Sequence, residues 1–250
     1  MGLALVAPPV RQLWHDLPQP GADRVPVATE VQHRLERVLR LGQGARVLLA
    51  DGQGRRLPAV WRGAEFEAAG DLQTSAPNDT QIVLGAGLLK GERWDWLIEK
   101  CTELGVDRLV PLQLDHCVVR IDAERGRDKV ERWRAIAIEA FEQCGRAVLP
   151  EIPAPLSLAG WLGQERDSLL CFCDERGSAV ALGDLVRSQR PRRLAILIGP
   201  EGGLSTAERA QLQEARAVGV TLGRDVLRAE TAALAALVIA RTASEPPPAG

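Results

Sequence analysis

Two glycine-containing loops in the second half of the chain carry the residues best suited to chemistry. The first, Gly199-Pro200-Glu201-Gly202-Gly203, directly follows the apolar run Leu194–Ile198. The second, from Leu222 to Thr231, combines Gly223 with four charged side chains. Glycine lets a backbone approach a ligand closely, and open α/β sheets bind ligands where strand ends meet helix N-termini. A plain connector explains either loop alone, but two at successive strand ends favour a shared binding rim.

The surroundings of the first loop predict its place in the fold. The run Leu194–Ile198 is apolar throughout, which is typical of a strand buried on both faces of a parallel sheet. Ser205 and Glu208 have the spacing of a capping box, which predicts that a helix begins there. The loop therefore joins the carboxyl end of a buried strand to the start of a helix.

An earlier glycine-containing stretch, "LGAGLLKGE", follows a predicted strand and superficially matches a dinucleotide-binding motif. That motif requires a third glycine, and Lys90 stands in its place. No Gly-Lys-Ser/Thr pattern of a phosphate-binding loop is present either. The sequence therefore disfavours a dinucleotide site and a P-loop.

The order of the predicted elements indicates two domains. Strands and helices alternate over residues 74–250, which predicts an α/β domain with a parallel sheet. Over residues 1–73, "ARVLLADGQGRRLPAVW" predicts two strands joined by an Asp-Gly turn, and "EFEAAG" predicts another strand. We expect this first part to form a small β-barrel-like module. The polar segment Gln73–Asp79 is the expected linker.

Composition excludes several functional classes. The 250 residues include 31 basic and 33 acidic side chains, so any nucleic-acid site needs local rather than global positive charge. No apolar run reaches the roughly 18–20 residues of a membrane helix, and we expect a cytoplasmic protein without a membrane partner. The five cysteines have no C-x-x-C spacing, so reduced thiols and no metal site are expected.

Arginines are the candidate contacts for an RNA backbone. The stretch "EVQHRLERVLRLGQG" predicts a helix with Val31, Leu35 and Val38 on one face. A solvated helix surface is the plainer explanation of the arginines on the opposite face. The candidates on this helix, in the predicted hairpin and after a later strand are Arg34, Arg37, Arg40, Arg55, Arg56 and Arg120.

Five segments together resemble a known enzyme family. They are "RVLRLGQGARVLLADG", "LLKGERWDWLIEKCTELGVDRLVPL", "EAFEQCGR", "LIGPEGGLSTAE" and "LGRDVLRAETAAL". In this order they are similar to the RsmE-type ribosomal RNA small subunit (uridine-N3) methyltransferases of the SPOUT class. The segment "DHCVVR", Asp115 to Arg120, departs from the family pattern, and His116 is only a weak candidate for a role.

The resemblance implies a fold, a cofactor and partners that composition and spacing do not show. It implies a knotted (trefoil) SPOUT methyltransferase domain over 74–250 that binds S-adenosylmethionine, and a PUA-like RNA-binding β-barrel over 1–73. It also implies a homodimer, with the small ribosomal subunit as partner. The reaction would be methylation of N3 of one uridine in small-subunit (16S) ribosomal RNA.

The resemblance also implies roles for individual residues. Arg228 would stabilise the negative charge that develops on the base, and Glu230 would accept its proton or orient Arg228. The expected cofactor-binding residues are Leu197, Ile198, Gly199, Glu201, Gly202, Leu222, Gly223, Val226, Leu227, Arg228, Thr231 and Ala232. Two alternatives stay open: methylation of another RNA target such as a ribose 2′-hydroxyl, or a non-enzymatic RNA-binding assembly protein.

Overall fold

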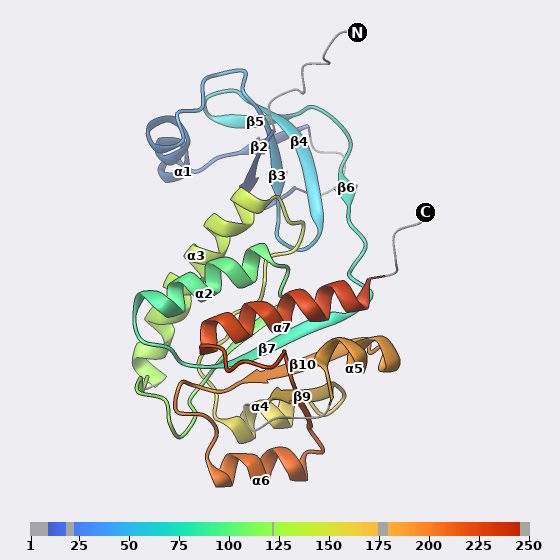
Figure 1. The fold of residues 1–250 in the computed structure, drawn as a ribbon. Helices are drawn as coiled ribbons and strands as arrows, with labels where there is room; N and C mark the ends of the chain where they lie inside the picture. The colour runs from blue at the N-terminus through green and yellow to red at the C-terminus, as the bar shows by residue number, and fades with distance from the viewer. Residues whose placement is uncertain (1–9, 19–22, 122, 175–179, 246–250) are drawn as a thin grey trace. The chain divides into compact units, whose positions relative to one another are not determined.

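A computed structural model describes residues 10–18, 23–121, 123–174 and 180–245 (Figure 1). The chain divides into two compact units. The first unit comprises Met1–Pro77 together with Phe141–Val148, and the second comprises Asn78–Ala140 and Leu149–Gly250. The chain passes from the first unit to the second between Pro77 and Asn78. Phe141–Val148 also belongs to the first unit, and no local pattern in the sequence predicts this.

The first unit contains one mixed β-sheet in the strand order β1-β3-β4-β5-β2, with β6 paired to β4. Its strands are β1 (Arg11–Trp14), β2 (Arg24–Pro26), β3 (Arg46–Ala50), β4 (Arg55–Trp61), β5 (Glu65–Ala68) and β6 (Gln73–Thr74). The predicted strands β3, β4 and β5 are confirmed. Alternate residues of β4 face a core in which the rings of Trp61 and Phe66 lie 4.9 Å apart. Closure of this sheet into a PUA-like barrel stays a prediction.

The predicted helix of the first unit is shorter and less regular than its sequence suggested. The α-helix α1 (Thr29–His33) continues directly into a π-helical turn, η1 (Arg34–Val38). Leu35 is buried as expected, but the expectation for Val38 was wrong, because this side chain is 69% exposed. The wider π-helical turn breaks the 3.6-residue period on which the prediction depended.

The second unit contains a five-stranded, fully parallel sheet in the order β11-β9-β10-β7-β8. This confirms the predicted α/β class with a parallel sheet. The strands are β7 (Gln81–Gly87), β8 (Arg108–Leu112), β9 (Leu169–Cys173), β10 (Arg193–Ile198) and β11 (Val218–Val220). The helices are α2 (Glu92–Glu103), α3 (Ala123–Cys144), α4 (Leu158–Gln164), α5 (Leu182–Gln189), α6 (Thr206–Glu214) and α7 (Ala229–Ser244).

The central strand and the last helix form the middle of this unit. Residues Leu194–Ile198 of β10 are at most 3% exposed, as expected for a strand with neighbours on both sides and layers on both faces. Helix α7 packs on β7 and β10 and contacts α2 and α5 (Figure 1). Its buried face is mostly alanine, Ala233, Ala236 and Ala240, which lets the helix lie close to the sheet. The first predicted loop therefore starts from a buried strand, and the second leads into a helix packed on the sheet.

Candidate active site

The carboxyl ends of β9, β10 and β11 open onto a pocket of about 360 Å³. Its volume is in the range of small-molecule sites. The glycine loop after β10 and the loop between β11 and α7 form most of its wall, so the structure brings together the two loops that the sequence singled out. The lining residues are Cys173, Asp174, Ile198, Gly199, Pro200, Glu201, Leu204, Val220, Thr221, Leu222, Gly223, Arg224, Asp225, Val226, Leu227, Arg228, Ala229 and Ala232.

Most of the predicted cofactor-binding residues line this pocket. The three that do not are Leu197, Gly202 and Thr231. Leu197 is fully buried in the sheet, where its side chain belongs to the hydrophobic core. Gly202 instead lies against a neighbouring loop. Thr231 is an exposed residue of the first turn of α7.

The glycine loop is held at three consecutive residues by three other parts of the second unit. At Pro200, the backbone nitrogen would lie 2.9 Å from a Cβ placed on Gly87, so the end of β7 packs directly against the loop. At Glu201, Oε1 lies 2.7 Å from Nη2 of Arg93 in α2. At Gly202, the carbonyl oxygen lies 2.9 Å from Nδ1 of His116. These three contacts hold the loop in place along one side of the pocket.

A network of hydrogen bonds joins the loop after β8 to the start of α6. The predicted capping box is present: the Ser205 side chain accepts from the Glu208 amide, and Glu208 accepts from the Ser205 amide. The other carboxylate oxygen of Glu208 accepts from the amide of Asp115 at 2.8 Å. Glu208 is only 3% exposed, so its charge is stabilised by these donors. Asp115 is therefore tied to the start of α6, and the neighbouring His116 contacts the glycine loop.

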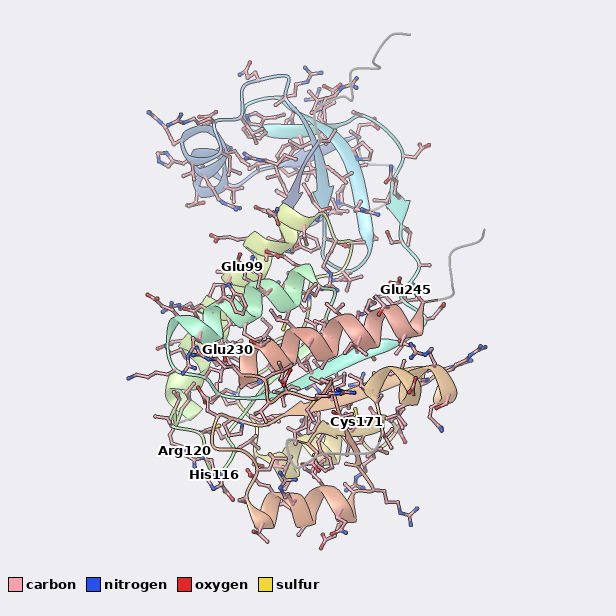
Figure 2. The ribbon with its side chains drawn as sticks, in the orientation of Figure 1. Glu99, His116, Arg120, Cys171, Glu230 and Glu245 are labelled. Atoms are coloured by element: carbon pink, nitrogen blue, oxygen red, sulfur yellow. The ribbon has the colours of Figure 1, made fainter. Side chains whose placement is uncertain are left out.

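The two predicted catalytic residues occupy different environments. Arg228 is exposed and lines the pocket, and its side chain makes no hydrogen bond or ion pair with the described residues. The side chain of Glu230 is only 12% exposed and does not line the pocket. Glu230 lies at the start of α7 (Figure 2). Its ionic partner is Arg93, whose Nη1 lies 3.9 Å from Glu230 Oε1. The structure therefore pairs Glu230 with Arg93 and leaves the Arg228 guanidinium available.

Comparison with known proteins identifies the family of this fold. A family model described as an RNA methyltransferase domain matches residues 76–241. The chain belongs to this RNA methyltransferase family. It is 30% identical over 222 residues to ribosomal RNA small subunit methyltransferase E of Bacillus subtilis, covering 84% of this chain and 87% of the relative. It is 33% identical over 225 residues to the Synechocystis protein of the same name, covering 85% and 71%.

A solved structure of similar fold extends the comparison to both units. The crystal structure of a ribosomal RNA small subunit methyltransferase E from Neisseria gonorrhoeae, bound to S-adenosyl methionine, has a TM-score of 0.80 and is 28% identical. The match covers 93% of this chain and 97% of the neisserial chain. The methyltransferase fold described above is therefore shared across both units.

Sequence reasoning missed several residues of the site in this methyltransferase. Cys173 is the last residue of β9 and Asp174 follows it, and both line the pocket. Asp174 Oδ1 lies 2.9 Å from Nη1 of Arg209. Burial raises the pKa of the Cys173 thiol to about 12, so the thiol is uncharged at neutral pH and adds no charge to the pocket. The rule that sites lie at carboxyl ends of parallel strands could have found both. Arg93 had no such signal, because it lies on a helix outside the two loops.

Some of the candidate RNA-binding arginines are already hydrogen-bonded or ion-paired within the protein, and others are not. Several have partners within their own unit: Arg34 with Glu142, Arg55 with Asp51, Arg56 with Ser75, and Arg120 with the carbonyl oxygen of Asp115. Arg37 and Arg40 are exposed and make no side-chain hydrogen bond or ion pair with any residue that the structure describes. These two are therefore the arginines best available to phosphate.

The described residues offer neither a metal centre nor a membrane span. No cluster of three or more His, Cys, Asp or Glu side chains could hold a metal ion in the part of the chain that the structure describes. Within the same residues, no helix is both long and apolar enough to cross a membrane.

Proposed function

We propose that the protein transfers a methyl group from S-adenosylmethionine to N3 of a uridine in small-subunit ribosomal RNA. The observation that carries the proposal is the pocket built from the glycine loop and the Leu222–Ala232 segment, with an unpaired arginine at its wall. The proposal is supported by curated relatives named as small-subunit methyltransferases and by a neighbour solved with S-adenosyl methionine.

The pocket residues fit an amphipathic, positively charged nucleoside cofactor. Ile198, Leu222 and Ala232 supply apolar surface for an adenine ring, and Gly223 has open space beside its backbone, with no atom within 4 Å of a Cβ placed there. The carboxylates of Asp174 and Glu201 also line the pocket. When bound, the cofactor supplies a methyl group already activated by its sulfonium. The backbone at Gly199, Gly223 and Leu227 would hold it.

The chain's own residues must make N3 nucleophilic, because a neutral uracil carries a proton there. Arg228 lines the pocket without an internal partner, so its guanidinium can stabilise the negative charge that spreads onto the flanking carbonyl oxygens. The proton goes to a carboxylate. Two carboxylates joined by Arg93 are the candidates, Glu201 and Glu230, and only Glu201 lines the pocket.

The remaining parts of the proposal concern RNA and assembly. The first unit would act as a PUA-like RNA-binding module, with Arg37 and Arg40 contacting phosphates. The second unit would have the trefoil knot of the SPOUT class and form a homodimer. The activity would be cytoplasmic, where ribosomal subunits are present. The match of both units to the neisserial methyltransferase supports this assignment.

The decisive experiment is incubation of the protein with methyl-labelled S-adenosylmethionine and unmethylated small subunits, followed by nucleoside analysis. Label in N3-methyluridine supports the proposal. Label in a 2′-O-methylated nucleoside would replace it with the ribose alternative. Retention of subunits on the protein with no label transferred, and no cofactor binding in calorimetry, would support the non-enzymatic assembly role instead.

A further inference from the structure

Arg93 contacts Glu201 in the pocket wall and Glu230 in the first turn of α7, without lining the pocket itself. It lies in the first turn of α2, and its two terminal nitrogens reach carboxylates of different elements. Nη2 lies 2.7 Å from Oε1 of Glu201, and Nη1 lies 3.9 Å from Oε1 of Glu230. One planar guanidinium therefore links the glycine loop to the first turn of α7.

The backbone of Arg93 is anchored in the core of the second unit. The next residue, Trp94, is only 2% exposed, and its ring lies 5.8 Å from that of Trp133. Just before the helix, Gly91 has a φ of +58°, a conformation that suits glycine and fixes where the helix begins. The guanidinium therefore extends from a fixed point.

Both carboxylates pair with this cation. Glu230 Oε2 is buried and has no hydrogen-bond partner among the described residues, so Arg93 is the cation that faces this carboxylate. Glu201 lines the pocket, and Glu230 lies on the same helical turn as the lining residues Ala229 and Ala232. Without Arg93, the negative charges of Glu201 and Glu230 would lose the cation that pairs with both of them.

We propose that Arg93 is a positioning residue, which holds the glycine loop against the first turn of α7 and thereby sets the shape of the cofactor pocket. The inference rests on the proposed function, because the ligand is the proposed cofactor. Lysine cannot replace this arginine fully, since an ammonium lacks the planar fork that reaches two carboxylates at once. Methionine keeps much of the side-chain length but removes the charge.

The test compares the dissociation constant for S-adenosylmethionine, measured by calorimetry, in wild type, Arg93→Met and Arg93→Lys. We expect Arg93→Met to raise it by about five-fold, the upper end for exposed ion pairs, and Arg93→Lys to recover part of the loss. Arg132→Met is the matched control. Arg132 also pairs with an α2 carboxylate, Asp95, but lies outside the pocket wall. The Arg132→Met variant should therefore bind S-adenosylmethionine as tightly as wild type.

A double-variant cycle separates positioning from a general effect on stability. If Arg93 acts through Glu201, Arg93→Met combined with Glu201→Gln should bind about as weakly as the weaker single variant. Full additivity, or equal losses in Arg93→Met and Arg132→Met, would overturn the inference. The inference would also be overturned if Arg93→Met bound the cofactor as tightly as the wild-type protein does. That outcome would leave the proposed function intact. Failure of the wild-type protein to bind the cofactor would overturn both.

Discussion

His116 and Gly202 lie in direct contact across two loops of the second unit. Nδ1 of His116 is 2.9 Å from the Gly202 carbonyl oxygen and 3.1 Å from that of Gly203. Because both carbonyl oxygens only accept hydrogen bonds, Nδ1 carries the hydrogen. A Cβ placed on Gly202 would lie 2.8 Å from the Cβ of His116. The glycine at position 202 is therefore required by a close approach between loops.

The substitution Gly202→Ala should destabilise the protein by about 1–3 kcal/mol, because the new methyl group overlaps His116 and one loop must move. The change is measured as the free energy of unfolding in urea. Gly163→Ala is the control: Gly163 lies inside α4, and a Cβ placed on it has no atom within 4 Å, so alanine should be neutral or slightly stabilising. Equal effects of the two changes would contradict the steric explanation.

The substitution Arg228→Ala should lower kcat for methyl transfer by about 10²–10³-fold, since it removes the proposed stabiliser of charge on the base. Arg228 makes no ion pair with the described residues, so the melting temperature should stay close to that of wild type. The measurement is single-turnover transfer to small subunits, with Arg166→Ala, an exposed arginine outside the pocket, as control. Normal turnover in Arg228→Ala would remove this residue from the mechanism.

The substitutions Arg37→Gln and Arg40→Gln should each reduce the salt dependence of RNA binding by about one unit in the slope of log K against log salt concentration. Both side chains are exposed and unpaired among the described residues. Filter binding at several salt concentrations measures the slope. Arg34→Gln should instead lower stability, because Arg34 is paired at 2.8 Å with Glu142, a carboxylate only 11% exposed. Unchanged slopes in the first two variants would argue against an RNA surface here.

Glu165 should make the stability of the second unit sensitive to acid. Its carboxylate is fully buried and lies 2.8 Å from Arg193 and 3.0 Å from Arg108. Burial raises the pKa of Glu165, but hydrogen bonds from Arg193 and Ser168 and the charges of both arginines lower it by more, so the pKa is below its usual range. This stabilisation is present above the unfolded-state pKa of about 4.3 and is lost as the pH falls through the folded-state value.

The variant Glu165→Gln should therefore be about 2–4 kcal/mol less stable than wild type at pH 7, because two arginines lose their buried partner. The difference should shrink as the pH falls below about 4. Urea unfolding at pH 7, 5 and 3.5 measures it. A difference that does not change with pH would show that the charge of Glu165 contributes no stability.

Local patterns in the sequence were sufficient for the elements that carry the site. The apolar run Leu194–Ile198 is a buried central strand, and Ser205 with Glu208 forms the capping box of the next helix. Both signals depend only on residues a few positions apart in the chain, so they can be recognised before the tertiary structure is known. The alternation of strands and helices likewise predicted the parallel sheet. Spacing alone could not show what the glycine loop packs against.

Only the tertiary structure decided which distant residues line the pocket and which hold its loops in place. The strand order β11-β9-β10-β7-β8 brings Asp174 beside the two predicted loops, and the packing of α2 on α7 brings Arg93 to Glu201 and Glu230. The return of Phe141–Val148 to the first unit is of the same kind. Such contacts follow from the order of strands and the packing of layers, which bring together residues far apart in the chain and leave no periodic trace in it.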